Sequence, residues 1–63
     1  MFIQSGQLRD VQKRFPSTTK DDCKVVMEFG NDKGTHFDGN FIVSIKRKGV
    51  YRFENGEFVK RVE

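Results

Sequence analysis

The chain has 63 residues, which is room for one domain, and its 12 basic and 9 acidic residues give a formal net charge of +3. Seven phenylalanines are spread along it, an aromatic content that excludes a disordered composition. The single cysteine excludes an internal disulfide, and one cysteine with one histidine is too few ligands for a zinc site. Aromatic packing or a partner therefore has to stabilise the fold.

The sequence also gives an expectation about the compartment. It holds no run of about 18 apolar residues that could form a transmembrane helix. Residues 1–5 lack the basic region and the long apolar run of a signal peptide. The absence of paired cysteines fits a reducing compartment. We therefore expect a cytoplasmic protein with no membrane partner and no cofactor.

A short helix is predicted over residues 6–15. Apolar side chains recur at helical spacing on one side of this segment, namely Leu8, Val11 and Phe15. Ser5 is the predicted N-cap. Pro16 ends the helix, because the residue before a proline is disfavoured in the α conformation. A helix this short is marginal alone, so its apolar stripe should pack on a sheet.

Alternating apolar residues predict that sheet. The pattern begins at Cys23 and recurs in three later segments. The inward residues of the predicted sheet core are Val25, Met27, Phe29, Phe41, Val43, Ile45, Phe53 and Phe58. The fold class is predicted as α+β: a short N-terminal helix packed on a four-stranded antiparallel β-meander. Strong bending at Gly39 would instead roll the sheet into a half-barrel.

Turn residues predict the register of the strands. Asn55-Gly56 favours a two-residue hairpin that pairs Phe53 with Phe58. Before it, a three-residue loop with Gly49 in the left-handed conformation is favoured and pairs Val43 with Phe53. The competing two-residue turn would direct Val43 outward, because a slip of one residue reverses every side chain.

Two further turn signals lie in the middle of the chain. Asp32-Lys33-Gly34 predicts a loop that places Phe29 opposite Phe37. Asp38-Gly39-Asn40 fits either a turn between two strands or a bulge in one long strand over residues 35–46. The bulge is favoured slightly, since residues 35–37 alone would make a very short strand.

Histidine and cysteine are each present only once. His36 has sequence neighbours on opposite strand faces and so lacks a group to orient it. Cys23 follows Asp21 and Asp22, whose charges disfavour the reactive thiolate, and it lies on the inward face. The pair Glu54 and Glu57 flanks a hairpin turn and should be solvated. The sequence therefore predicts no enzyme and no metal site.

The basic residues are concentrated near the C-terminus, and they supply the candidate site. The predicted register puts Lys46, Val50 and Arg61 in one outward row and Ser44, Arg52 and Val59 in the next, with Ile42, Glu54 and Glu57 beyond. The basic end of this outward face is the candidate partner-binding surface. Its predicted residues are Lys46, Arg47, Lys48, Arg52, Arg61, Val50 and Val59.

Four interpretations of this surface stay open. Aliphatic residues beside several cations favour a small regulator or inhibitor that binds an acidic protein surface. Phages and mobile elements encode many such proteins. This is an analogy with a class of proteins and not a resemblance in motifs. The alternative is a nucleic-acid-binding module that contacts the phosphate backbone, although the predicted outward face lacks aromatics for stacking. An ordinary solvated face, or a homodimer that buries Ile42, Val50 and Val59, would also explain the pattern.

Overall fold

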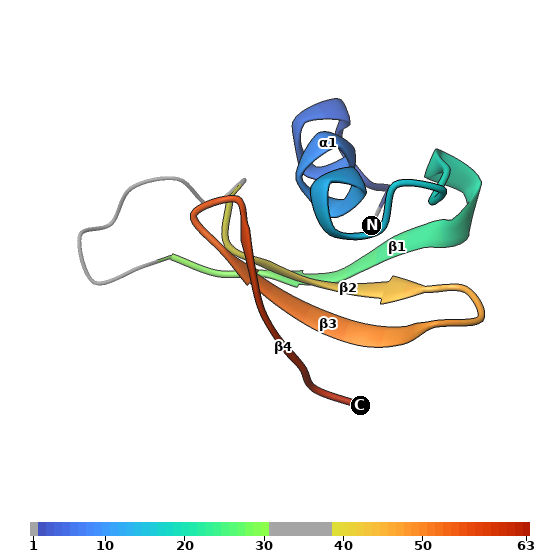
Figure 1. Cartoon of the computed structure of the whole chain (residues 1–63). Coiled ribbons are helices and arrows are strands. Elements are labelled where there is room, and N and C mark those ends of the chain that lie inside the picture. Colours follow the sequence, from blue (N-terminus) through green and yellow to red (C-terminus); the bar gives the residue numbers. More distant parts are fainter. Residues whose placement is uncertain (1, 31–38) are drawn as a thin grey trace.

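An N-terminal helix lies against one face of a four-stranded antiparallel sheet in the computed structural model, which describes residues 2–30 and 39–63 (Figure 1). The elements are helix α1 (Ser5–Arg14), the 3-10 helix η1 (Lys20–Asp22) and strands β1 (Cys23–Glu28), β2 (Phe41–Ile45), β3 (Gly49–Glu54) and β4 (Glu57–Arg61). The strands lie side by side in sequence order. This confirms the predicted α+β meander, in the open form rather than as a half-barrel.

Helix α1 begins one residue before its predicted start, and its N-cap is Gln4 rather than Ser5. The backbone N–H of Gln4 donates to Oε1 of the buried Gln7 at 2.9 Å. The side chain of Gln7 thus reaches back from the first turn to the backbone of the N-cap residue, which is the N3 half of a capping box. Neither helical segment in the described ranges is long and apolar enough to cross a membrane.

The core lies between α1 and the sheet face that it covers. Its buried apolar residues are Ile3, Val11, Val25, Phe41, Val43, Ile45, Tyr51 and Phe53, with Leu8, Phe15, Cys23 and Phe58 partly buried against them. Phe41 and Phe53 are cross-strand partners whose rings stack in parallel with centroids 5.0 Å apart. Phe15 of the helix end packs on Tyr51 at 4.8 Å. Aromatic pairs of this kind add to the free energy of burial.

A β-bulge at Val26 overturns part of the predicted core. Val25 pairs with Val43, but the next paired residue of β1 is Met27, which lies opposite Ile42. The extra residue reverses the alternation. The prediction of Met27 and Phe29 as core residues is therefore wrong. Glu28 takes the inward place instead, opposite Phe41.

The pairing of β2 with β3 is shifted by two residues from the predicted register. Val43 pairs with Tyr51 and Ile45 with Gly49, so the connection is residues 46–48. The N–H of Lys48 donates to the C=O of Ile45 at 3.0 Å. Arg47 takes the left-handed conformation with φ 69°, and Gly49 has the predicted positive φ, at 128°. A shift of two residues preserves the faces, so the inward side chains of both strands are as predicted.

The Asn55-Gly56 hairpin is confirmed. Both residues have positive φ, and Phe53 pairs with Phe58 as predicted. A second bulge follows at Val59, because the next paired residues are Arg52 and Lys60.

The loop predicted at Asp32-Lys33-Gly34, its pairing of Phe29 with Phe37, and His36 lie outside the described residues. Gly39 and Asn40 precede β2, which begins at Phe41, so the bulge favoured at 38–40 is not found in its described part. The C=O of Asn40 accepts the N–H of Phe29 at 2.9 Å. The hydrogen bonding between β1 and β2 therefore continues by one residue pair beyond the ends of the two strands.

Candidate functional site

The face of the sheet opposite α1 carries the candidate binding surface. Within the described ranges, no helix lies against it (Figure 1). The register places three sets of residues there, and together they define the open face. These are the central row Met27, Ile42, Arg52 and Lys60, the row Lys24, Ser44 and Val50 toward the basic turn, and the pair Glu54 and Glu57 at the opposite end.

The centre of the open face is apolar on one side and cationic on the other. Met27 of β1 is 49% exposed, and the bulge residue Val26 beside it is 57% exposed. Ile42 of β2 follows in the same row, and then come Arg52 of β3 and Lys60 of β4. A solvent-exposed methionine and valine next to two cations form a surface of the kind found at protein interfaces.

Arg52 is held in place by two neighbours. Its Nε donates to Oε2 of Glu54 at 2.7 Å, and its guanidinium carbon lies 4.2 Å from the centroid of the Phe29 ring. Its side chain remains 33% exposed. A guanidinium fixed between a ring and a carboxylate loses less conformational entropy when it binds a further group. Arg52 is therefore a pre-organised cation in the middle of the open face.

The structure divides the predicted site residues between the two sides of the sheet. Val50 and Arg52 lie on the open face, whereas Lys46 and Arg47 lie in the exposed turn after β2. The predicted outward place of Arg61 is wrong, because the bulge at Val59 puts it opposite Tyr51, whose ring faces α1.

Lys48 and Val59, the remaining predicted residues, also depart from the expected rows. The ammonium of Lys48 lies 5.8 Å from the centroid of Phe15, on the helix side of the sheet. Val59 is the bulge residue and is 44% exposed. The basic end was predicted as one surface, but its residues are divided between the two sides of the sheet.

Cations on the helix side cover the edge of the core. The guanidinium carbon of Arg14 lies 5.1 Å from the ring centroid of Phe15 and 4.9 Å from that of Phe58. The hydroxyl of Tyr51 donates to the C=O of Lys48 at 2.7 Å. These contacts add cation–π stabilisation to the packing of α1 on β4. We therefore assign Arg14 and Lys48 to the fold rather than to a binding surface.

The basic turn has an acidic neighbour. Asp22 accepts hydrogen bonds from the backbone N–H of Thr19 at 3.3 Å and from its hydroxyl at 3.0 Å. These bonds lower the pKa of Asp22, and the charges of Lys46 and Arg47 lower it further. The positive charge of the turn is partly offset by this carboxylate, as that of Arg52 is by Glu54. The central row is the stronger candidate for binding because Arg52 is fixed in position and lies in a row with the exposed Met27.

Sequence reasoning missed Met27, Phe29 and Lys60 as members of the site. Each owes its place to a bulge, and the sequence around Val26 and Val59 holds no glycine or proline to mark one. Lys24 could have been included, because it lies between Cys23 and Val25, two residues of the inward alternation, and it is observed on the open face opposite Ser44.

Cys23, at the start of β1, is a free and partly buried thiol. Burial raises the pKa of the Cys23 thiol, and the charge of Asp22 raises it further, so the thiolate is disfavoured. Among residues 2–30 and 39–63, no group of three histidine, cysteine, aspartate or glutamate side chains could hold a metal ion.

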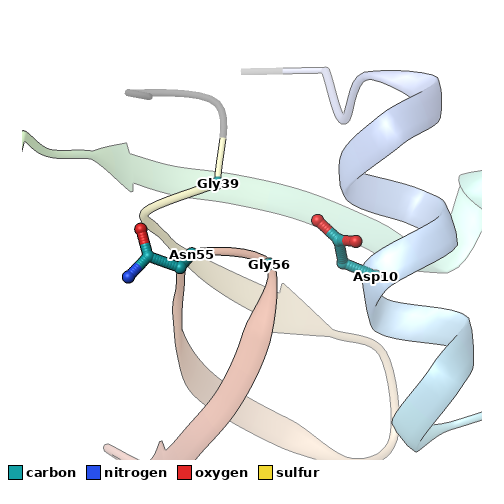
Figure 2. A pocket seen from close by; sticks show the side chains of 4 residues that line it. All are labelled: Asp10, Gly39, Asn55 and Gly56. Carbon is teal, nitrogen blue, oxygen red and sulfur yellow. The ribbon is translucent and has the colours of Figure 1, made fainter. Parts of the chain in front are cut away.

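A groove separates α1 from the β3–β4 hairpin. Its lining residues are Asp10, Gly39, Asn55 and Gly56, and it is an open groove of about 290 Å³ (Figure 2). Asp10 points from the helix toward Gly56, whereas the side chain of Asn55 points away from it. The N–H of Gly56 donates to the C=O of Gly39 at 2.8 Å. The groove therefore places a carboxylate over bare backbone.

Burial of Asp10 should make stability depend on pH. Desolvation raises its pKa above the ordinary 3.8, although Lys13 and Arg9 act in the opposite direction. A raised folded pKa means that the folded state is favoured below the ordinary pKa, and that this advantage is lost as the pH rises through the folded pKa. We expect Asp10→Asn to melt at or above the wild-type temperature at pH 7.

Thermal melts from pH 3 to pH 7 measure this effect. The Asp10→Asn variant should lose less stability than the wild type as the pH rises from about 3.8. Asp22 contributes a slope of opposite sign in both proteins, so only the difference between them is informative. The control is Asp21→Asn, the same substitution at an exposed carboxylate. A lower melting temperature for Asp10→Asn at pH 7 would contradict the expectation.

No family model, curated protein or solved structure matches the chain. Its function is therefore inferred from the geometry of its own surfaces.

Proposed function

We propose that this chain is a small, non-enzymatic regulator or inhibitor that binds an acidic protein surface through the open face. One observation carries the proposal, the pre-organised Arg52 in a row with Met27, Ile42 and Lys60. Aliphatic side chains supply area that is favourable to bury, and the cations supply attraction and orientation. An arginine can bind a partner carboxylate with two hydrogen bonds, so it would be the specific anchor.

A protein partner is favoured over nucleic acid by two features of the same face. Glu54 and Glu57 lie opposite each other at one end, where they would repel a phosphate backbone running along the strands. Phe29 is an aromatic on this side of the sheet, but the guanidinium of Arg52 covers a face of its ring. Single-strand binders instead present open rings on which bases stack.

Charge reversal at the central row tests the proposal. The double substitution Arg52→Glu with Lys60→Glu should reduce partner binding by at least tenfold, because attraction becomes like-charge repulsion. The control is Arg61→Glu, a single charge reversal one residue further along β4 and on the helix side of the sheet. Its binding should stay within about twofold of the wild type.

The three proteins serve as parallel baits in one lysate, and the captured protein is then titrated against each of them. A partner retained by the wild type and Arg61→Glu but lost by the double variant supports the open face. Equal retention by all three, with normal thermal melts, contradicts it. Melting curves are needed because Arg52 also packs on Phe29.

Two further measurements decide between the alternative partners. Binding to random single- and double-stranded oligonucleotides at low salt, with a steep loss of affinity as salt rises, would replace the protein partner with nucleic acid. Sedimentation equilibrium that gives twice the chain mass, with dissociation in the double variant, would identify the occupant of the open face as a second copy.

A further inference from the structure

The basic turn, residues 46–48 between β2 and β3, lies at one end of the open face. The backbone N–H of Lys46 donates to the C=O of Asp22 at 2.8 Å, so the turn is held beside η1. Lys24, on the open face, is in the second residue pair of β1 and β2 counted from this turn. All three residues of the turn are exposed, and the ammonium of Lys48 is directed to the helix side of the sheet. Lys46 and Arg47 are therefore the cations with which the turn continues the open face.

The backbone of this turn does not suit the residue at its third position. Residues 45–48 form a β-turn that is closed by the hydrogen bond from the N–H of Lys48 to the C=O of Ile45 at 3.0 Å. Arg47 has φ 69°, whereas Lys46 has no positive φ, which is the pattern of a type II turn. Glycine or asparagine is favoured at the third position of such a turn, because a Cβ atom makes the left-handed conformation costly.

Asn55 provides the contrast within the same chain. It also has positive φ without being glycine, but asparagine before glycine is the favoured sequence of its hairpin. Arg47 breaks the corresponding rule, and its side chain makes no hydrogen bond, ion pair or ring contact with the described part of the chain. An unfavourable backbone conformation that brings no contact within the molecule is typical of a functional position.

The surroundings of Arg47 favour a carboxylate as its ligand. A guanidinium can bind a carboxylate or a phosphate with two parallel hydrogen bonds. Asp21 and Asp22 of η1 interrupt the positive charge around the turn, and Asp22 is close enough for Lys46 and Arg47 to lower its pKa. A regular chain of phosphates would meet these carboxylates. A folded protein can instead place one acidic group on Arg47 and neutral groups beside it.

We propose that the basic turn is a second contact of the open-face interface, in which Arg47 binds a carboxylate of the acidic protein partner. This inference rests on the proposed function and adds to it where the partner's acidic groups lie. One group faces Arg52 in the central row, and another lies beyond the row of Lys24. Arginine at position 47 then serves binding at the expense of an ideal turn.

An NMR titration of the ¹⁵N-labelled chain with a small acidic peptide tests the contact. The probe is acetyl-Glu-Leu-Glu-amide, and its uncharged control is acetyl-Gln-Leu-Gln-amide. The amides of Arg47 and Gly49 report on the turn, and those of Ile42 and Arg52 report on the central row. We expect saturable shifts at the turn with the acidic peptide and at least tenfold weaker binding of the control. Tighter binding of a short thymidylate strand at the same amides would assign the turn to phosphate and overturn the proposal.

Matched variants separate this inference from the proposed function. Arg47→Gln removes the guanidinium of the turn, and Arg9→Gln removes the same charge from an exposed position of α1. Binding measured at the turn amides should fall at least fivefold in Arg47→Gln and stay within twofold in Arg9→Gln. Unchanged binding in Arg47→Gln overturns the inference. The double variant Arg52→Glu with Lys60→Glu tests the central row by its own amides, so the two proposals fail separately.

Thermal melts add a readout that does not depend on the peptide. Arg47→Asn fits the turn better than arginine does, since asparagine tolerates the left-handed conformation. We expect this variant to melt at or above the wild-type temperature while it binds the acidic peptide as weakly as Arg47→Gln. A melting temperature well below that of the wild type would give Arg47 a structural role in the turn and overturn the proposal.

Discussion

Phe53→Ala should leave the chain unable to fold by itself. Phe53 is fully buried on β3, stacks in parallel on Phe41, and meets Phe58 edge to face with centroids 5.9 Å apart. Truncation of a buried phenylalanine to alanine costs about 3–5 kcal/mol. A domain of this length has a free energy of unfolding of about 3–9 kcal/mol, from about 0.05–0.15 kcal/mol per residue. The loss is therefore comparable to the whole stability.

Circular dichroism during a thermal melt measures the effect of this substitution. The variant should show no cooperative transition, or one at a far lower temperature. The control is Phe2→Ala, the same truncation at a side chain that is 92% exposed, and its free energy of unfolding should change by less than about 0.5 kcal/mol. A cooperative melt of Phe53→Ala near the wild-type temperature would contradict the packing described for β3.

Gln7→Ala should be the most damaging substitution of a polar residue in α1. The side chain is 1% exposed and makes two contacts: Oε1 accepts the N–H of Gln4, and Nε2 donates to Oε2 of Glu28 at 2.6 Å. Loss of the cap costs about 1 kcal/mol, and loss of a hydrogen bond to a charged group costs about 1.5–3 kcal/mol. We expect a total of about 2.5–4 kcal/mol.

Urea unfolding gives this free energy directly, with Arg9→Ala as a control at an exposed position of the same helix. Glu28→Gln separates the two contributions, because it removes the charge but retains an acceptor for Gln7. It should cost less than Gln7→Ala. If Gln7→Ala were as stable as Arg9→Ala, the bond between α1 and β1 would have no part in stability.

The parts of the fold that could be predicted from the sequence are those with a local chemical signal. The apolar spacing of Leu8, Val11 and Phe15 predicted the helix, and Pro16 predicted where it stops. Asn55-Gly56 predicted the pairing of Phe53 with Phe58, because few other residues adopt positive φ twice in succession. These signals were enough for the fold class.

The parts that could not be predicted depend on two β-bulges, which reverse the alternation of inward and outward side chains along a strand. Met27 and Phe29 continue the apolar alternation of Cys23 and Val25, so nothing local marks the bulge at Val26. The reversal brings Glu28 to the buried amide of Gln7, on an element far away in the sequence. Such a bond between distant segments has no periodicity that a single sequence could display.

The candidate site was affected in the same way. Arg52 was assigned to the outward face correctly, because a shift of the β2–β3 register by two residues does not change the side of the sheet on which it lies. Arg61 was not, because the single extra residue at Val59 exchanges its place with that of Lys60.

The two bulges have a consequence for the edges of the sheet. Strands β1 and β4 are the outermost strands, and each carries one of them, at Val26 and Val59. An incoming chain that adds itself as a fifth strand needs a regular ladder of free N–H and C=O groups, which a bulge interrupts and twists. The two bulges therefore disfavour the addition of a further strand at either outer edge, although the open face is uncovered by a helix in the described ranges. Growth of fibrils from the native state would first require an outer strand to lose its irregularity.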